Sequence, residues 1–323
     1  MTLILLIIVL ILAACLYTYN IAFYSPRHKR SGFDSPVHGS QYEAVAEHIY
    51  RISHIMQRYS FEEITVTAHD GIRLYGRYYH LKDGAPVQIL FHGYRSHAYR
   101  DCSGGHALAR KMGFNTLVID QRGQGNSGGR TITFGIKERL DCRTWIQYVT
   151  DRFGTESPIL LSGLSMGAAT VLMAADLDLP KNVCCILADS PYSTPSAILE
   201  KVAADKHYPV ALCRPFLHLS AFLFGGFLLN SHTAKDSVRN TDIPVLLIHG
   251  EDDRLVPYTM SLEIAACCAS RVQVVTFPQA GHGLCYITDP KRYERSVYEF
   301  LKTIPSLQHR IDPSFIASVY DNS

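Results

Sequence analysis

The sequence lacks both a metal-binding pattern and a strong net charge. Its nine cysteines include no C-x-x-C pair, so the spacing typical of a structural zinc site is absent. The net charge is only +2, and no stripe of lysine and arginine is interleaved with aromatic residues, which argues against a nucleic-acid partner. Internal repeats and low-complexity tracts are also absent, and 47% of the residues are hydrophobic. We therefore expect a chain that buries a sizeable core.

Charged side chains are also missing from the first 24 residues, where a long hydrophobic run lies. Leu3–Leu16 is continuously apolar, and aromatic residues follow as far as Tyr24. This length fits one tilted membrane helix with its tyrosines at the interface. We predict that residues 1–24 form a single-pass membrane anchor. The basic cluster Arg27–Arg30 follows at once, and the positive-inside rule then places the globular part on the cytoplasmic side.

Two alternatives to an anchor are weaker on the same residues. A cleaved signal sequence usually carries lysine or arginine before its apolar run, and none precedes Leu3. Leu12-Ala13-Ala14-Cys15 resembles the box at which bacterial lipoproteins are cleaved and lipid-modified. Here the basic amino-terminal region is missing and the residues after Cys15 are apolar, which disfavours lipid modification.

Residues 25–60 are predicted to connect the anchor to the globular part. Ser35 can cap a helix that begins at Pro36. Apolar residues then recur at helical spacing, at Tyr42, Val45, Ile49, Ile52 and Met56. We expect an amphipathic helix that links anchor and domain. The alternative is a helix on the membrane surface, which the weakly basic polar face disfavours.

Beyond residue 60, short apolar strands alternate with helical stretches. "FEEITVTA" and "IRLYGRYYH" flank Asp70-Gly71, which predicts a hairpin turn. Six more apolar segments follow, from "VQILFHG" to "VQVVTFP". Helices are predicted over residues 101–112, 134–152, 166–178, 256–270 and 290–303. This alternation predicts the α/β class, with a mostly parallel, doubly wound sheet and any active site at the carboxyl ends of its strands.

One stretch interrupts the alternation and divides the expected core into residues 61–190 and 241–304. Residues 191–240 hold no predicted core strand, and their segment "PVALCRPFLHLSAFLFGGFLLN" is strongly apolar. We predict a helical lid insertion over the active site, with a pair of core helices as the alternative. An apolar lid favours a substrate with an acyl or other hydrophobic part. Residues 305–323 are expected to form a C-terminal tail.

The segment "LLSGLSMGAAT" places Ser165 in a Gly-x-Ser-x-Gly pattern between an apolar strand and a helical stretch. This context is typical of a nucleophile elbow. Gly163 and Gly167 lack a Cβ, so strand and helix can approach closely around a strained serine. A serine hydroxyl becomes a nucleophile when a base removes its proton, and that base is usually a histidine oriented by a carboxylate. Ser165 is the candidate nucleophile, and an ordinary serine between two glycines is the alternative.

Candidates for the acid and the base follow later strands. The loop "HGEDDRLVP" carries three acidic residues. We predict Asp253 as the acid, with Asp252 as the alternative in this loop. Asp189, at the end of "CILADSP", is a second alternative, although a capping or turn role is favoured there. His282 lies between two glycines just after the final strand and is the predicted base, so nucleophile, acid and base follow the chain order expected for such an elbow.

Backbone N–H groups near the serine are expected to stabilise an oxyanion. The chain after His92-Gly93 can turn so that the Tyr94 N–H points at the oxyanion. The Met166 N–H, at the positive end of the following helix, is the second predicted donor. His92 is expected to be structural, with hydrogen bonds beneath the loop, and the Tyr94 side chain is expected at the acyl pocket.

The stretch "GQGNSG" (Gly123–Gly128) matches a dinucleotide-binding pattern after a strand. A nucleotide site would also require a helix that opens at once and an acid at the end of the next strand. Gly129-Arg130-Thr131 instead continues a loop, and the next strand ends at Ser165. We expect tight turns beside the active site, no NAD, and neither a metal ion nor an organic cofactor.

Taken together, "FHGYRS", "DQRGQGNSGG", "GLSMG", "HGEDDRLVP" and "AGHG" resemble the motifs of the α/β-hydrolase superfamily, in the family's order, over Phe61–Leu301. Within it the chain resembles membrane-anchored bacterial serine hydrolases, with the core shared by serine aminopeptidases of the S33 type and prolyl oligopeptidases. More distantly it is similar to animal membrane-associated lipases and depalmitoylases. The resemblance implies the α/β-hydrolase fold, a triad of Ser165, Asp253 and His282, and oxyanion donors at Tyr94 and Met166.

The function predicted from the sequence is a serine hydrolase that cleaves a carboxylic ester or thioester through an acyl-enzyme. The expected partners are a small-molecule or lipid-like acyl substrate and a membrane. A serine peptidase acting on short peptides would use the same three residues. A non-catalytic binding protein of the same fold is the third hypothesis, because a fold does not determine a function.

Overall fold

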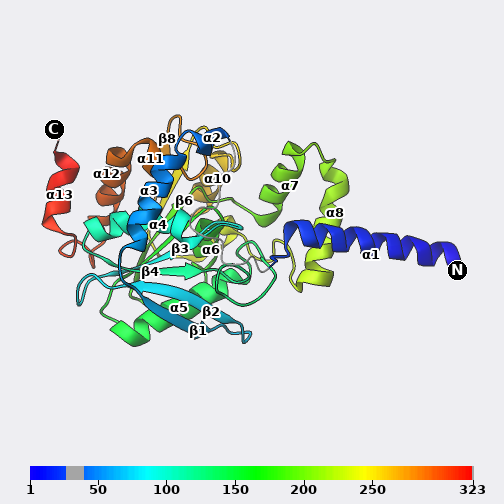
Figure 1. Ribbon diagram of the computed structural model, residues 1–323, viewed down its shortest axis with the longest axis horizontal. Helices are drawn as coiled ribbons and strands as arrows, with labels where there is room; N and C mark the ends of the chain where they lie inside the picture. Colours follow the sequence, from blue (N-terminus) through cyan, green and yellow to red (C-terminus); the bar gives the residue numbers. More distant parts are fainter. Residues whose placement is uncertain (27–39, 322–323) are drawn as a thin grey trace.

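The computed structural model describes residues 1–26 and 40–321 (Figure 1). Its centre is an eight-stranded sheet in the order β1-β2-β4-β3-β5-β6-β7-β8. β2 pairs antiparallel with β1 and β4, and the other neighbouring pairs are parallel. The strands are β1 Glu62–Thr67, β2 Arg73–Tyr79, β3 Val87–Phe91, β4 Asn115–Asp120, β5 Ile159–Leu164, β6 Val183–Asp189, β7 Val245–Gly250 and β8 Val272–Phe277. The predicted α/β class and mostly parallel sheet are confirmed.

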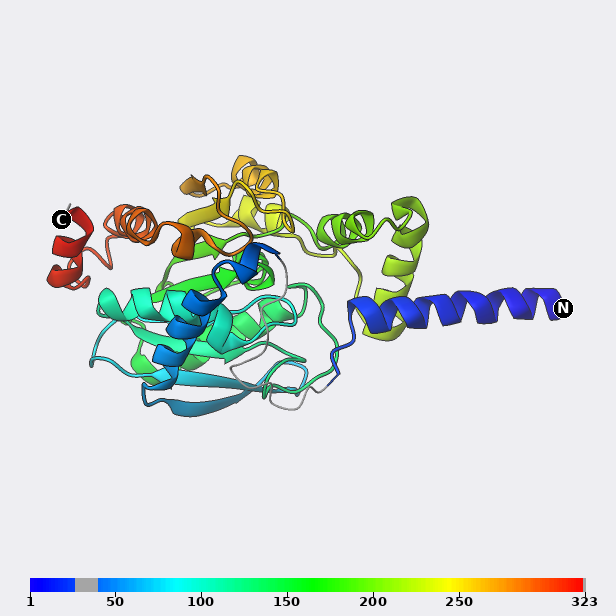
Figure 2. The same ribbon diagram turned by 45° about the horizontal axis from the view of Figure 1, so that its top comes forward.

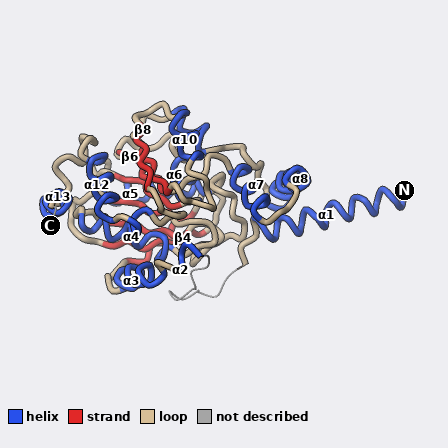
Figure 3. Tube along the Cα trace, turned by 90° about the horizontal axis from the view of Figure 1, so that it is seen from above, coloured by secondary structure: helices blue, strands red, loops and turns tan. Residues whose placement is uncertain are grey.

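Helices enclose the sheet on both faces, as the continuously apolar strands require (Figure 3). β3, β4 and β7 are buried along their whole length. The five predicted core helices are present with their ends shifted by a few residues. The helices around the sheet are α3 Ala46–Gln57, α4 Ala98–Lys111, α5 Glu138–Phe153, α6 Met166–Met173, α10 Thr259–Cys267, α11 Cys285–Thr288, α12 Pro290–Leu301 and α13 Pro313–Tyr320.

The sheet separates two apolar cores. Successive side chains of a strand point to opposite faces, and Leu160 and Leu161 of β5 accordingly enter different cores. The larger core includes Trp145 of α5 and is covered by α5, α6 and α10. The other is covered by α4, α12 and α13, and Phe315 of α13 is buried in it. Most of the expected C-terminal tail therefore packs against the domain.

The first helix, α1 (Thr2–Ala22), is long and apolar enough to cross a membrane, by length and composition. Only 6% of its most apolar window is buried, and it projects away from the sheet (Figures 1 and 2). A signal sequence would pass the same test. Its carboxyl end is nevertheless built into the domain, because Phe23 is fully buried and its carbonyl accepts a hydrogen bond from the Ile132 N–H at 2.8 Å.

The segment between α1 and the sheet differs from a simple linker. The predicted sidedness and the predicted helix start depended on Arg27–Arg30, Ser35 and Pro36. These residues lie outside the described part of the chain. The described part begins with the short helix α2 (Ser40–Glu43), and α3 then starts after Val45. Ile49 and Met56 of α3 are buried, and α3 packs against α4 of the core. This segment therefore covers part of the domain.

Residues 191–240, all of which the structure describes, contain helices and no strand. They are α7 Pro195–Asp205, α8 Val210–Ser220, the π-helical turn η1 Ala221–Gly225, α9 Ala234–Ser237 and the 3-10 turn η2 Val238–Asn240. Figure 1 shows α7 and α8 at the end of the molecule from which α1 projects. The insertion is helical, but its helix α8 packs against α1.

Candidate active site

Ser165 occupies the sharp turn between β5 and α6. Its backbone has φ 56° and ψ −114°, a conformation that an L-residue adopts only under strain. The turn is fixed on both sides, because the Ser165 N–H donates to the Asp189 carbonyl at 2.8 Å and the Ser165 carbonyl accepts from the Ala169 N–H at 3.0 Å. The hydroxyl is thus presented at the carboxyl edge of the sheet.

The glycines on either side of Ser165 allow this turn to form. A Cβ at Gly163 would collide with the backbone of Gly167, and a Cβ at Gly167 would collide with the Phe91 carbonyl of β3. Strand β5, helix α6 and strand β3 therefore pack backbone to backbone around the serine. The close approach expected from the Gly-x-Ser-x-Gly pattern is present.

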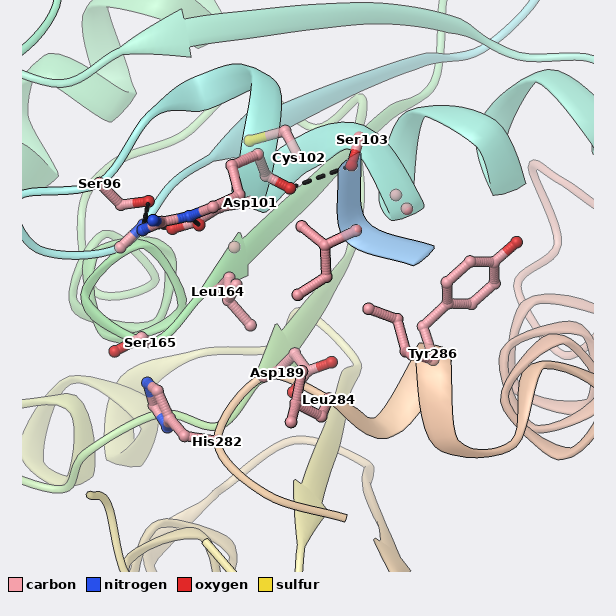
Figure 4. Close-up of a pocket in the computed structure, with 18 of the residues that line it drawn as sticks. Ser96, Asp101, Cys102, Ser103, Leu164, Ser165, Asp189, His282, Leu284 and Tyr286 are labelled. Atoms are coloured by element: carbon pink, nitrogen blue, oxygen red, sulfur yellow. Dashed lines mark hydrogen bonds and ion pairs between the residues drawn. The ribbon is translucent and has the colours of Figure 1, made fainter. Parts of the chain in front are cut away.

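His282 and Asp253 form a short hydrogen bond. The imidazole Nδ1 lies 2.6 Å from Asp253 Oδ2. The other carboxylate oxygen, Oδ1, accepts from the backbone N–H groups of Leu255 at 2.9 Å and Val256 at 2.8 Å. Since a carboxylate only accepts hydrogen bonds, Nδ1 carries the proton, which leaves Nε2 of His282 free to act as a base. Figure 4 shows a ring nitrogen of His282 directed toward Ser165.

A second histidine, which the sequence did not single out, also holds the acid. His249, at the end of β7, is fully buried, and its Nε2 lies 3.2 Å from Asp253 Oδ2 and 2.9 Å from the Val256 carbonyl. Its Nδ1 lies 2.7 Å from Ser261 Oγ, a hydroxyl that can donate to it. The position of His249 just before the acid loop, in "LLIHGEDD", was the available signal.

These contacts determine the ionisation of Asp253. Burial alone raises the pKa of a carboxyl group, but the hydrogen bonds from His249 and His282 outweigh it and bring the pKa of Asp253 well below its usual range. Asp253 is therefore a carboxylate at neutral pH. A charged acid is what stabilises an imidazolium during proton transfer.

The other acidic candidates make different contacts. Asp252 is exposed, whereas Asp189 is buried and accepts hydrogen bonds from the hydroxyls of Ser190 at 2.9 Å and Tyr293 at 3.2 Å. Among the described residues, only Asp253 of these three hydrogen-bonds His282. Burial raises the pKa of Asp189, although its hydrogen bonds and the nearby histidines lower it in part.

The loop after β3 approaches the elbow, because a Cβ at Gly93 would lie 3.5 Å from Ser165 Cβ. The Gly93 N–H donates to Asp101 Oδ2 at 2.8 Å, and Arg95 adopts a left-handed φ of 49°, which turns the chain. His92 lies beneath this loop, as expected: its Nδ1 is 2.8 Å from the Gly93 carbonyl and its Nε2 accepts from the Gln121 N–H at 3.0 Å. Met166 is the first residue of α6, so its N–H points out of the helix end beside Ser165.

The Tyr94 side chain contacts the end of α1, which the sequence did not predict. Its hydroxyl donates to the Ala22 carbonyl at the end of α1, at 2.8 Å. The neighbouring Arg95 guanidinium donates to the Tyr24 carbonyl at 2.6 Å. The loop that carries one candidate oxyanion donor is therefore bonded directly to the end of the apolar helix.

Ser165 and His282 line one pocket of about 290 Å³ (Figure 4). It extends away from them between α3, α4 and α11, and its far part is lined by Ile49 and Ile52 of α3, Gly104 and Gly105 of α4, and Tyr286 and Ile287. None of residues 191–240 lines it. The predicted lid therefore does not form its wall, and α3 does.

The amino-terminal segment also holds the loops that carry the candidate base and acid. The Tyr42 hydroxyl donates to the His282 carbonyl at 2.9 Å, and the Gln41 side-chain amide donates to the Asp252 carbonyl at 2.9 Å. A tyrosine at the start of an amphipathic helix gave no hint of this contact. The residues that cover the pocket and those that fix its loops thus come from the same short segment.

The glycine-rich stretch Gly123–Gly128 forms the expected tight turns, but none of its residues lines the pocket of Ser165 and His282. The Gly123 N–H donates to the Gly128 carbonyl at 2.7 Å, and the Asn126 N–H donates to Asp120 Oδ2 at 2.9 Å. The next helix, α5, begins only at Glu138. The helix that a dinucleotide site requires directly after this stretch is therefore not formed.

Two family models match the core. A model for serine aminopeptidase, S33, matches residues 86–212, and a model for the prolyl oligopeptidase family matches residues 228–306. The uncharacterized protein YqkD of Bacillus subtilis is 25% identical over 248 residues, which cover 75% of this chain and 81% of YqkD. Human protein ABHD12B is 27% identical over 222 residues, which cover 61% of this chain and 56% of ABHD12B.

Solved structures agree with these matches. The Pyrococcus furiosus esterase Pf2001 superposes with a TM-score of 0.63 at 22% identity, over 84% of this chain and 97% of the esterase. At this identity the likeness speaks for the fold. Together with the elbow and the two family models, which each match part of the core, it shows that the chain has the α/β-hydrolase fold.

Proposed function

We propose that this protein is a serine hydrolase that cleaves a carboxylic ester or thioester of a hydrophobic acyl group at a membrane. The observation that carries the proposal is a single constellation. A serine on a strained elbow shares a pocket with a histidine whose Nδ1 is 2.6 Å from a buried carboxylate. This is the arrangement that activates a serine hydroxyl.

In the proposed reaction, His282 Nε2 takes the Ser165 proton as Oγ attacks the carbonyl carbon of the substrate. The carbonyl oxygen becomes an oxyanion, which the N–H groups of Tyr94 and Met166 stabilise. His282 then gives its proton to the leaving alcohol or thiol, and an acyl-Ser165 ester remains. Water, deprotonated by the same imidazole, attacks this ester, and the free acid and the serine hydroxyl are regenerated. Asp253 orients the imidazole and stabilises its cation.

The pocket supports an acyl substrate. Its wall includes the apolar side chains of Ile49, Ile52, Leu284 and Ile287, and also the polar ones of Arg100, Asp101 and Asp189. The two adjacent glycines of α4 let Tyr286 and Leu90 pack directly against the helix, because a Cβ at Gly104 would meet Tyr286 at 3.0 Å and a Cβ at Gly105 would meet Leu90 at 2.9 Å. The apolar part of this wall, between α3 and α11, suits the hydrocarbon chain of an acyl group.

A serine peptidase is the second candidate, because the family model that matches residues 86–212 is described as serine aminopeptidase. Both activities use the same three residues, so a comparison of substrates decides between them. We expect the full chain, in detergent micelles, to hydrolyse p-nitrophenyl acyl esters and to leave aminoacyl p-nitroanilides of similar size uncut. Ser165→Ala should abolish turnover. Faster cleavage of the anilides would favour the peptidase, and no turnover of either would favour a binding protein.

A further inference from the structure

Large apolar side chains are exposed on the outer helix of the insertion. Leu212 of α8 is 60% exposed, Phe222 of η1 is 57% exposed and Leu228, just beyond, is 61% exposed. Leu219, Leu223 and Phe224 on the same stretch are also exposed. Outside α1, the other exposed large hydrophobic side chains of the described chain are mostly scattered singly over several elements. A gathered apolar surface of this kind marks a site of interaction.

This surface is continuous with α1. The rings of Tyr19 in α1 and Phe224 in η1 lie 5.9 Å apart, and Cys15 of α1 is fully buried. Figures 1 and 2, from two directions, both show α8 crossing α1 toward its carboxyl end. The exposed side chains of α8 and η1 therefore lie beside the apolar helix.

The length of α1 fixes where this crossing lies in a membrane. All 21 residues of the helix extend for about 31 Å, which matches a hydrocarbon layer of about 30 Å. Thr2–Ala14, the part before Cys15, reaches only about 20 Å. If α1 spans the layer, the crossing with α8 falls within the membrane boundary and not in water.

The charge of α8 is compatible with that position. Arg214 is ion-paired with Glu200 of the neighbouring helix α7, with Nε 2.7 Å from Oε1. The other exposed side chains named above are hydrocarbon, and His218 is a further exposed polar side chain of α8. A short helix with one apolar face and a paired charge is suited to the plane between headgroups and acyl chains.

We propose that α8, η1 and the turn through Leu228 are embedded in the membrane interface beside α1, so that the protein binds lipid through a crossed two-helix unit. The partner of this surface is the bilayer itself. The active-site edge of the sheet then faces the membrane, because α1 enters the domain beside the Tyr94 loop. The proposal does not depend on the hydrolytic function.

Tryptophan fluorescence tests this placement on the full chain. The native Trp145 is fully buried in the core, so it gives a background that lipid cannot reach. Phe222→Trp adds an emitter on the proposed surface. Phe61→Trp adds one at a 37% exposed position just before β1, at the opposite edge of the sheet. Each variant is reconstituted in phosphatidylcholine vesicles with and without brominated acyl chains.

We expect brominated lipid to remove most of the emission added by Phe222→Trp and to leave Phe61→Trp and the wild type unchanged. Leu212→Trp repeats the test on α8 if Phe222→Trp does not fold, and it should be quenched as well. Quenching by aqueous iodide but not by brominated lipid would place this face in water. Protection from both quenchers would place it under a second copy of the chain. Either of these results overturns the proposal.

Discussion

At the residue scale, Asp253 holds the candidate site together through four hydrogen-bond donors. Its oxygens accept hydrogen bonds from two imidazoles and two backbone N–H groups, which accounts for its lowered pKa. Asp253→Asn should lower kcat for a p-nitrophenyl ester by the order of 10³–10⁴, because an amide cannot hold His282 in the required tautomer. Asp252→Asn is the matched control in the same loop and should retain most activity.

Asp189 provides the competing assignment of the acid. Asp189→Asn should keep most of the ester hydrolysis of the wild type, since Asp189 bonds Ser190 and Tyr293 and not His282. A loss with Asp189→Asn that equals the loss with Asp253→Asn would show that both carboxyl groups serve the base.

The raised pKa of Asp189 also predicts that the stability of the fold depends on pH. Because burial raises the pKa of Asp189, the folded chain holds this proton more tightly than the unfolded chain. The folded state therefore loses stability as the pH rises from about 4, where the unfolded carboxyl ionises, through the raised value. The melting temperature of Asp189→Asn relative to the wild type should thus increase between pH 4.5 and pH 8. A constant difference across this range would contradict the raised pKa.

The sequence was most informative about residues in glycine-containing loops at the ends of strands. Ser165 and His282 each lie in a glycine-flanked loop, and the structure places both in one pocket. His249 and Tyr42 were missed, because a histidine inside a strand and a tyrosine on an amphipathic helix look like ordinary core residues. Their contacts with Asp253 and with the His282 loop depend on tertiary packing that no local pattern encodes.

At the scale of elements, α3 forms the wall that the insertion was expected to form. Ile52→Trp should narrow the pocket and lower kcat/KM for a p-nitrophenyl octanoate by roughly tenfold relative to the acetate, since one misfitting group in an apolar pocket has about this effect. Ile55→Trp, on the same helix, is the control because Ile55 is 43% exposed and does not line the pocket. Equal effects of the two changes on kcat/KM would show that α3 does not line the substrate pocket.

The elements themselves could be predicted, but not where each one lies. Alternating strand and helix patterns predicted the parallel sheet and the core helices, since these depend on local periodicity. Which helix covers the pocket is set by long-range contacts, such as that of Tyr42 with the His282 loop. The apolar character of 191–240 was real, but it indicates exposure beside α1 and not a lid over Ser165.

At the scale of the whole molecule, the end of α1 is a structural part of the domain. Phe23 is fully buried, and its ring lies 5.9 Å from that of Phe134 and 5.3 Å from that of Phe227. Phe23→Ala should destabilise the fold by about 3–5 kcal/mol, the usual cost of emptying a buried aromatic site. Tyr17→Ala, at a 66% exposed position of α1, should change it by less than about 0.5 kcal/mol.

Thermal unfolding of the two variants in the same detergent measures this difference. Equal melting temperatures would mean that α1 is a detachable tail. A large decrease in the melting temperature for Phe23→Ala alone would show that the end of α1, to which the Tyr94 loop is bonded, stabilises the domain. The sequence alone shows only a hydrophobic run here, because Phe134 and Phe227, which Phe23 contacts, lie more than a hundred residues away along the chain.

The proposed function depends on Ser165 as a nucleophile activated by His282 and Asp253. A fluorophosphonate that reacts with activated serines tests it directly, with the adduct located by peptide mass spectrometry on the full chain. We predict one adduct, on Ser165, in the wild type and none in Ser165→Ala. Equal labelling of both proteins, or an adduct on another serine of the pocket such as Ser96 or Ser103, would contradict the role of Ser165 as the activated nucleophile.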